Sequence, residues 1–219
     1  MDDETVLHAL LYRLRQGCSW RALCIFAPFT TIYTRWKQWC QAGVWAAILK
    51  RLASRGAGRL WAIDSTCIKV HKHGTGGPGG PEKQAIGDTR GGRNTKVHAL
   101  VDGKARPVRL LLTAGNRHDI IGAPDLVAGQ SDRTILADKA YDSDGFRGLL
   151  EELGLRACIP PKGGRVNPPS YHSGYYRKRH TVENFFQRIK EFRAIATRYE
   201  KLAERFLNLT TLAAIAVWL

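Results

Sequence analysis

Apolar side chains recur at helical spacing through the first quarter of the chain. Near the start, leucines fall three and four residues apart, at positions 7, 10, 11 and 14. This spacing predicts the buried face of a helix. Gly17 ends that helix and Ser19 begins another, and two more are expected at about 30–43 and 44–53. Four of the six tryptophans lie in this segment, and we interpret them as the core of a small bundle with a basic exterior.

After a linker at residues 54–58, the pattern changes to short runs rich in β-branched and aromatic residues, which is typical of strands. Strands are expected at about 60–70, 96–101, 107–112, 134–137 and 155–159. Helices are expected at about 119–127, 143–153, 176–198 and 202–218. Residues 74–81 hold so many glycines and prolines that a loop is expected. Three strands followed by alternating helices and strands predict an α/β fold built on a mixed sheet.

Composition and charge narrow the class of protein. The 219 residues are 44% hydrophobic, which is enough for a packed core. The net charge of +15 indicates a polyanionic partner, either nucleic acid or an acidic membrane surface. Membrane insertion is not expected, because the longest apolar run, at 212–219, is far shorter than the roughly 20 residues that a spanning helix needs.

Three further absences bear on location and cofactors. The acidic start of the chain is unlike a targeting segment, so a cytoplasmic, nucleoid-associated location is expected. The five cysteines contain no C-x-x-C pair and are interpreted as reduced thiols. No G-x-x-x-x-G-K-[ST] pattern occurs, so a nucleotide cofactor is not expected.

Three acidic residues stand where a carboxylate is hard to explain structurally. Asp64 interrupts an apolar strand, Asp138 ends another, and Glu183 lies on the long helix. Burying a carboxylate is costly unless it is paired or bound to a metal. Because functional groups of open α/β sheets gather beyond the carboxyl ends of strands, Asp64 and Asp138 are expected to be neighbours. Converging carboxylates would hold a pair of Mg²⁺ ions, the arrangement used in phosphodiester chemistry.

The helix expected at 176–198 carries a second signal. At about 100° per residue, one stripe roughly 60° wide contains Tyr176, Arg179, Glu183 and Lys190. The plainer explanation is a solvated face on which Arg179 and Glu183 pair at i, i+4 spacing. Cations suited to phosphate, beside a carboxylate suited to metal, favour a site instead.

Four stretches of the sequence form a recognisable set. They are Trp61–Thr66, Thr95–Asp102 with Leu112–Asp119, Ala137–Ser143, and Tyr176-x-x-Arg179-x-x-x-Glu183-x-x-x-x-x-x-Lys190. Together they resemble the Asp-Asp-Glu transposases of bacterial insertion sequences, in particular the insertion-sequence-five group of the insertion-sequence-four superfamily. The last spacing is a signature of that superfamily and matches at all four positions. The resemblance runs from about residue 3 to the C-terminus.

This resemblance implies an architecture and a chemistry. A small all-helical domain of DNA-binding type at 1–55 would precede a catalytic domain at 56–219, with a ribonuclease-H-like mixed sheet flanked by helices. Asp64, Asp138 and Glu183 would be catalytic and would bind two Mg²⁺ or Mn²⁺ ions. The implied reaction is cleavage of transposon ends by metal-activated water, followed by attack of the freed 3′-hydroxyl on target DNA.

Double-stranded DNA, as transposon ends and as target, is the implied partner, and we expect a dimer in the DNA complex. The residues expected to contact DNA are Tyr176, Arg179, Lys190, Lys139 and Arg193. Members of the family usually have a further stretch before the residues with which this chain begins, so a shortened helical domain is expected. An intact short version, one frame of a split gene and a truncated relic all stay open.

Two other functions stay open as well. A non-catalytic DNA-binding regulator of transposition fits a shortened N-terminus. A structure-specific nuclease fits the three carboxylates but leaves the basic stripe around Glu183 unexplained.

Several nearby polar residues have plainer explanations. His71 and His73 lack further ligands for zinc, so a polar strand end is favoured. Asp142 and Asp144 are interpreted as caps of the next helix, and Asp119 is expected to support the site at most. A basic group is a candidate for phosphate contacts, namely Lys162, Arg165, Arg177 and Lys178.

Overall fold

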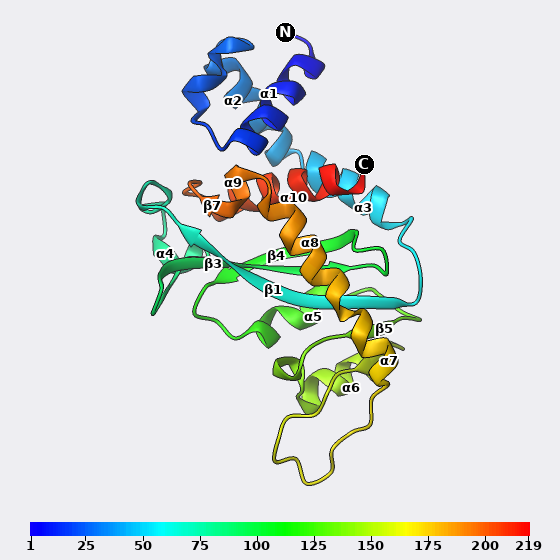
Figure 1. Ribbon diagram of the computed structural model, residues 1–219. Coiled ribbons are helices and arrows are strands. Elements are labelled where there is room, and N and C mark those ends of the chain that lie inside the picture. Colours follow the sequence, from blue (N-terminus) through cyan, green and yellow to red (C-terminus); the bar gives the residue numbers. More distant parts are fainter.

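A mixed sheet of seven strands forms the centre of the computed structural model, which describes residues 1–219 (Figure 1). The strands are β1 (Leu60–Val70), β2 (Gly87–Thr89), β3 (Gly92–Val101), β4 (Pro107–Ala114), β5 (Thr134–Leu136), β6 (Arg156–Cys158) and β7 (Thr197–Arg198). Their order is β2–β3–β1–β5–β6, with β4 also paired to β3 and β7 also paired to β1. β1 is therefore an interior strand of the sheet.

One edge of β1 is open in its middle. β1 pairs along most of its length with the antiparallel strand β3. On its other edge it pairs with the parallel strand β5 only as far as Ala62, and with β7 only at Lys69 and Val70. Residues 63–68 have no strand beside them on that edge. At about 3.3 Å per residue, the open edge is roughly 20 Å long.

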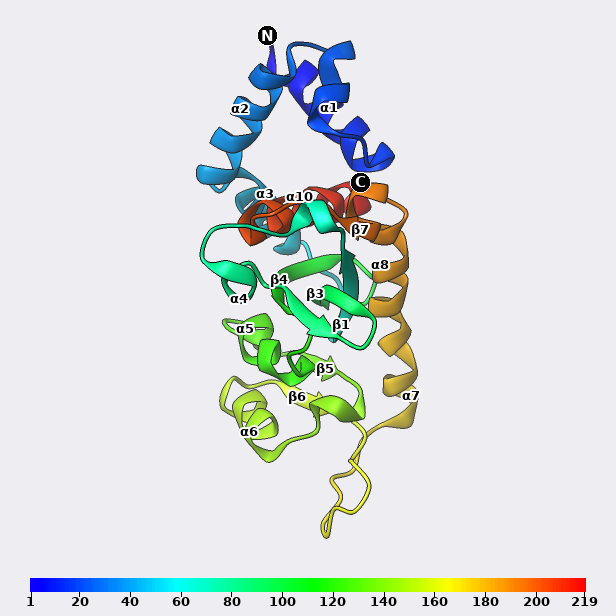
Figure 2. The same ribbon diagram turned by 90° about the vertical axis from the view of Figure 1, so that its left-hand side faces the viewer.

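Helices cover both faces of the sheet (Figure 2). Because successive strand residues point to opposite faces, Ala62 and Ile68 lie in one hydrophobic core and Trp61 and Ile63 in the other. The first core lies under α8 (His180–Lys190) and α10 (Ala203–Trp218), and the second under α5 (Ala123–Val127) and α6 (Asp144–Glu152). The buried face of α8 has helical spacing, at Val182, Phe185, Phe186 and Ile189.

The N-terminal helices form a unit that shares its core with the sheet layer. They are α1 (Asp3–Gln16), the 3₁₀ helix η1 (Trp20–Ile25), α2 (Phe29–Gln41) and α3 (Val44–Ala53). Asp2 caps α1 by accepting from the Thr5 backbone N–H at 2.7 Å, and Gly17 ends it with a left-handed φ of 66°. α3 packs against α10 and β4. One cluster of buried apolar residues consequently runs from the first helix to the last.

The helix expected at 176–198 is interrupted. The segment forms α7 (Ser173–Tyr176), the 3₁₀ turn η5 (Arg177–Arg179), α8 and α9 (Arg193–Ala196), and it ends in strand β7. Tertiary pairing causes the change at Thr197, because β7 lies beside Lys69 and Val70 of β1. A two-residue strand is too short to leave a period in the sequence.

The remaining elements are short. They are η2 (Lys72–Gly74), α4 (Gly80–Lys83), η3 (Asp119–Gly122) and η4 (Lys139–Tyr141). β2 and α4 were not expected, and α4 begins at the end of the glycine-rich segment 74–81. None of the helices has the length and apolar content needed to cross a membrane.

Candidate active site

Asp64 and Asp138 occupy matching positions on neighbouring parallel strands. The last paired residues are Ala62 on β1 and Leu136 on β5, and each aspartate lies two residues further along its chain. Parallel neighbours lie about 4.8 Å apart, so the two aspartates stand side by side where β5 ends. Asp138 then begins η4, and its Oδ1 accepts from the Ala140 backbone N–H at 2.9 Å.

Arg179 joins Glu183 to Asp64. Its Nη1 donates to Asp64 Oδ2 at 2.6 Å, and its Nη2 donates to Glu183 Oε1. Glu183 lies in the first turn of α8, and Arg179 lies four residues earlier in η5. Figure 1 shows α8 crossing β1. One guanidinium therefore bridges the helix and the strand, and two of the three predicted catalytic carboxylates share it.

The other residues of the predicted stripe lie against the same part of β1. Lys190 Nζ donates to Thr66 Oγ1 at 2.6 Å, and Thr66 faces the same side of the strand as Asp64. The half-buried Tyr176 ring has the Arg179 guanidinium 5.9 Å from its centroid. The stripe thus faces the stretch of β1 that has the open edge.

The last two predicted DNA contacts lie in different places. Lys139 directly follows Asp138 and is exposed, so it stands beside the carboxylates. Arg193 is also exposed but begins α9, beyond the end of α8. Its backbone lies close to Gly17, where a Cβ would come within 3.2 Å of the Arg193 carbonyl carbon. Arg193 therefore belongs to the contact between α1 and α9, away from the three carboxylates.

Negative charge is concentrated around Asp64. Burial raises the pKa of Asp64 to about 6. The Ser65 backbone N–H, which donates to Asp64 Oδ1 at 2.7 Å, and the Arg179 charge oppose that rise, whereas Asp138 and Asp119 add to it. For Arg179 itself, burial lowers the pKa, but the charges of Asp64 and Glu183 outweigh burial and raise it. The carboxylates therefore favour a cation between them.

The chemistry of these side chains, though not their present positions, suits a divalent metal. Carboxylate oxygens are the donors that Mg²⁺ prefers, and the Arg179 guanidinium already provides a positive charge between Asp64 and Glu183. In this arrangement no group of three or more His, Cys, Asp or Glu side chains is close enough to hold a metal ion. Binding of an ion by all three carboxylates would therefore require Arg179 to leave them.

A second polar group lies on the other face of β1. The Ser65 hydroxyl donates to Asp119 Oδ1 at 2.7 Å, and Lys96 Nζ donates to the same atom at 2.6 Å. Tyr141 is fully buried, and its hydroxyl has no hydrogen-bond partner. Burial, together with the charges of Asp64 and Asp119, raises the pKa of Tyr141. The sequence suggested Asp119 as a supporting residue, but its link to Ser65 and Lys96 could not be predicted, because no spacing rule connects these positions.

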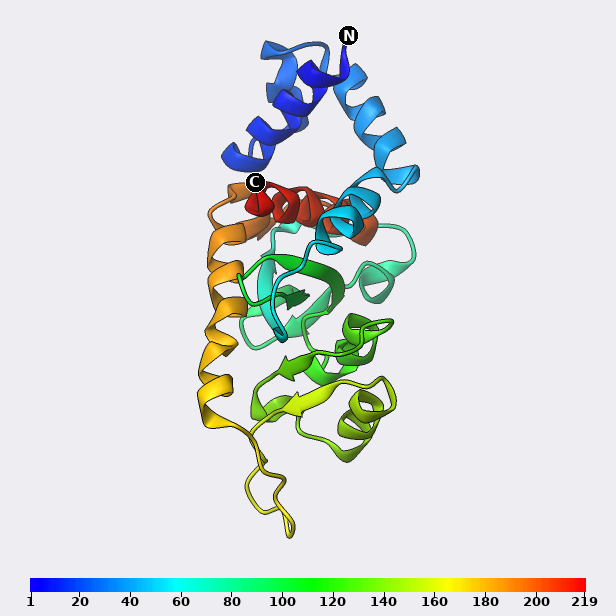
Figure 3. The same cartoon turned by 90° about the vertical axis from the view of Figure 1, so that its right-hand side faces the viewer.

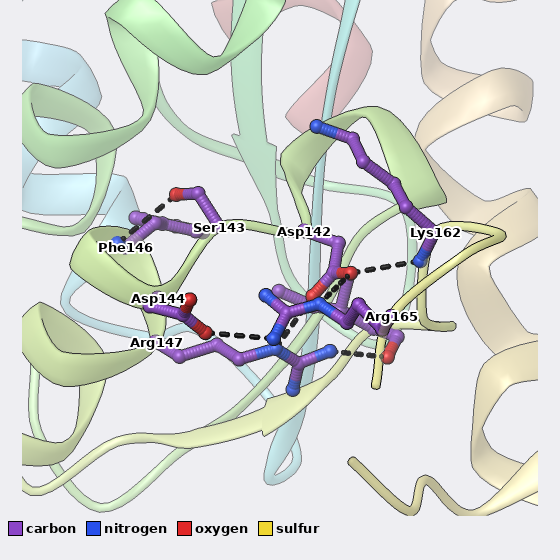
Figure 4. Close-up of polar contacts among 8 residues, drawn as sticks. Asp142, Ser143, Asp144, Phe146, Arg147, Lys162 and Arg165 are labelled. Carbon is purple, nitrogen blue, oxygen red and sulfur yellow. Dashed lines mark hydrogen bonds and ion pairs between the residues drawn. The ribbon is translucent and has the colours of Figure 1, made fainter. Parts of the chain in front are cut away.

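The interpretation of Asp142 and Asp144 as helix caps is wrong. Ser143 caps α6, because its Oγ accepts from the Phe146 backbone N–H at 3.2 Å. Asp142 is instead buried and accepts from Arg147 Nε at 2.7 Å (Figure 4). A carboxylate with no exposed surface needs such partners, and exposed N-caps do not.

Asp142 also anchors the segment that follows β6. It accepts from the Lys162 backbone N–H at 2.8 Å and from Arg165 Nε at 2.7 Å (Figure 4). Arg165 additionally pairs with Asp144 at 2.7 Å. Arg165, which the sequence suggested for phosphate contacts, therefore has two carboxylate partners of its own and serves to hold this segment against α6.

Two family models match different parts of the chain. Residues 55–219 match a family model described as "Transposase DDE domain". Residues 1–49 match one described as "Putative transposase of IS4/5 family". The first match covers most of the chain, including all the predicted catalytic and DNA-binding positions.

Two bacterial proteins are similar in sequence. One from Brucella ovis, described as "Putative transposase for insertion sequence element IS6501", is 35% identical over 127 residues, which are 57% of this chain and 98% of that protein. One from Burkholderia cepacia, described as "Putative transposase for insertion sequence element IS402", is 26% identical over 122 residues, 50% of this chain and 56% of that protein.

A solved structure shares the fold. In the piggyBac transposase synaptic complex with hairpin DNA, the matching chain gives a TM-score of 0.50 at 14% identity, covering 98% of this chain and 53% of that one. The expected ribonuclease-H-like mixed sheet flanked by helices is confirmed at the level of the fold. The chain spans just over half the length of the piggyBac chain and of the IS402 protein.

Proposed function

The chain belongs to the DDE transposases of the IS4/5 family, and from this we propose that it cleaves transposon ends and joins the freed 3′-hydroxyl to target DNA. The observation that carries the proposal is that Asp64 lies next to Asp138 and is joined to Glu183 through Arg179, at the open edge of β1. Carboxylates gathered around one cation suit phosphodiester chemistry.

Asp64, Asp138 and Glu183 would hold two Mg²⁺ or Mn²⁺ ions once Arg179 turns away from them. Such ions activate water as a nucleophile and stabilise the leaving oxygen. The chain's own cations then position the substrate: the freed Arg179 fork suits a DNA phosphate, and Lys190, Lys139 and the Tyr176 phenol supply further contacts.

The substrate would be double-stranded DNA, bound by a dimer of the chain. Residues 56–219 would carry the chemistry, and the helical unit 1–55 would contribute DNA binding, with Arg193 at the contact between the two. The net charge of +15 supports a polyanionic partner.

A second candidate is a DNA-binding regulator of transposition without cleavage activity. The contact of Arg179 with Asp64 and Glu183 favours it, because a guanidinium held there keeps the carboxylates from other cations. The two candidates differ in a single measurable product, a DNA strand with a new 3′-hydroxyl.

The test incubates the purified chain with a labelled mobile-element end and Mg²⁺. We expect a nick that leaves a 3′-hydroxyl, and we expect Asp64→Asn to abolish it while leaving DNA affinity within about twofold, because the amide lacks the charge that binds the metal. The exposed Asp88→Asn is the matched control and should cleave normally. DNA binding without any nick from the wild-type chain would favour the regulator.

A further inference from the structure

A cavity of about 630 Å³ lies between the helical unit and the sheet layer. α1, η1 and α2 line one side of it, and α9, the segment that follows β7 and α10 line the other. Figure 3 shows α1 and α2 diverging above α10. We call it the arginine cavity, after Arg13 and Arg205 in its wall. A ligand bound there would contact both units at once.

Buried positive charge around the arginine cavity exceeds the buried negative charge. Arg13 and Arg205, both in its wall, are each at least nine-tenths buried. Arg13 pairs with Glu200 at 2.7 Å, whereas Arg205 forms no ion pair and donates to the neutral Lys37 O. A buried charge without a counter-ion is costly, so this region lacks an anion.

Unused donors lie in the same wall. Nε and Nη1 of Arg13 and Nε of Arg205 are buried without a hydrogen-bond partner. Lys201 is exposed at the rim and adds a third positive charge. Guanidinium groups with free N–H donors are suited to phosphate.

Aromatic rings form the rest of the wall. Tyr33 and Tyr199 are 39% and 44% exposed although both line the cavity. Trp20 contacts Tyr33, with 4.9 Å between the ring centroids, and has the Arg13 guanidinium 4.2 Å from its own centroid. His71 stacks on one face of the Tyr199 ring, and Trp20 meets the Tyr33 ring edge-on, so a base would stack on the ring surface that stays exposed.

We propose that the arginine cavity binds one unpaired nucleotide of a DNA strand, with its phosphate at Arg13, Arg205 and Lys201 and its base against Tyr33 and Tyr199. The volume lies within the range of pockets that enclose small ligands, and a base must leave its stack to enter such a pocket. This inference rests on the proposed function, because it takes DNA as the partner.

The arginine cavity and the carboxylates can contact one DNA molecule. His73, which lines the cavity, lies just after the end of β1. Asp64 lies on the open edge of the same strand. The seven residue-to-residue steps from Asp64 to His71, which lies two residues before His73, span roughly 23 Å at about 3.3 Å per step. That length corresponds to about seven base-pair steps of B-form DNA at roughly 3.4 Å per step. The unpaired nucleotide would therefore lie several steps from the scissile phosphate.

The test measures affinity for short fluorescent duplexes without divalent ions, so that cleavage plays no part. A fully paired duplex is compared with a set in which one unpaired thymidine is moved along the strand. We expect at least one position to bind about tenfold more tightly than the paired duplex, in line with about 1.4 kcal/mol for one stacked base. Thymidine 5′-monophosphate at millimolar concentration should abolish that preference.

Variants assign the preference to the cavity. Tyr33→Leu and Lys201→Ala, both at exposed positions, should remove the preference and leave affinity for the paired duplex within about threefold. Tyr12→Leu is the matched control, because Tyr12 is equally exposed at 39% in the same unit but packs against Phe26 outside the cavity. It should keep the preference.

Three results would overturn the inference: no preference at any position, a preference that survives both cavity variants, or a preference that the free nucleotide does not compete away. If the free nucleotide binds saturably but unpaired DNA is not preferred, the cavity binds a soluble nucleotide. The proposal that it binds a nucleotide within a DNA strand would then be wrong. Failure of the proposed cleavage function can be told apart from failure of this inference. A chain that prefers the unpaired nucleotide but never nicks with Mg²⁺ loses the cleavage proposal and keeps this one.

Discussion

A buried carboxylate that accepts hydrogen bonds from two guanidinium groups is stable only while its partners stay in place. Asp142 has no exposed side-chain surface and accepts from Arg147 and Arg165. Burial raises its pKa, but the Lys162 backbone N–H and the two arginines outweigh burial and lower it. Asp142→Ala should cost about 3 kcal/mol of unfolding free energy, because it leaves two partly buried guanidinium groups unpaired.

Urea denaturation measures that cost. Asp144→Ala is the control, because Asp144 is 89% exposed and meets only Arg165; it should cost less than about 1 kcal/mol. Equal losses from the two variants would mean that the buried network adds nothing beyond an exposed ion pair.

His98 makes stability depend on pH. It is fully buried, its Nε2 lies 2.7 Å from Thr113 Oγ1, and its Nδ1 has no partner. Burial lowers its pKa from 6.5 to about 4. Between these values the unfolded chain binds the proton and the folded chain does not, so unfolding free energy falls as pH falls. The loss should approach about 2–3 kcal/mol by pH 4.

Thermal unfolding of His98→Gln against wild type isolates this contribution. Between pH 6.5 and pH 4, the unfolding free energy of the variant should fall by about 2–3 kcal/mol less than that of the wild-type chain. His8→Gln, at an exposed position on α1, should follow the wild-type profile. A parallel profile for His98→Gln would mean that His98 is protonated in the folded chain.

At the scale of elements, α8 carries both packing and charge. Its apolar face meets the sheet, and Lys190 at its end reaches Thr66 of β1. Under the proposed function Lys190 contacts a DNA phosphate, so Lys190→Ala should weaken binding and lower the slope of log affinity against log salt by about one unit.

Binding isotherms over a range of salt concentrations measure the slope. Lys104→Ala is the control, because Lys104 is exposed in the turn between β3 and β4. An unchanged slope for Lys190→Ala would remove Lys190 from the phosphate contacts. A slope lowered equally in both variants would point to net charge alone.

The sequence predicts elements wherever a period or a turn signal is local. The helices at 3–16, 29–41 and 44–53 and the β3–β4 hairpin follow from spacing and from Asp102-Gly103. β7 and the end of α8 could not be predicted, because Thr197 and Arg198 become a strand only through pairing with β1. Local propensity carries no information about such a partner.

The site shows the same division between local and distant causes. That Asp64 and Asp138 are neighbours is expected from placing both at strand ends, whereas Asp64 lies within β1, level with the point where β5 ends. The shared contact of Arg179 with Asp64 and Glu183 depends on where η5 crosses β1, and the anchoring of Asp142 depends on a segment twenty residues away. Both contacts depend on tertiary packing, which the spacing of residues along one helix does not reveal.

At the scale of the whole molecule, the helical unit and the sheet layer share one core. Trp45 and Leu49 of α3 are 4% and 6% exposed and belong to the same buried cluster as Leu209 and Leu212 of α10. A 55-residue segment is small for a separate domain, and the apolar core of this one continues into another layer at α3. The division at residue 55 would then separate functions without separating folding units.

Two measurements test that single core. A fragment of residues 1–55 should lack a cooperative thermal transition, because α3 loses the surface on which it packs. In the full chain, Leu49→Ala should cost about 2–4 kcal/mol and lower one shared transition, whereas Ile48→Ala, at a position 38% exposed, should cost less than about 1 kcal/mol. Cooperative unfolding of the isolated fragment, or two separate transitions in Leu49→Ala, would make the helical unit an independent domain.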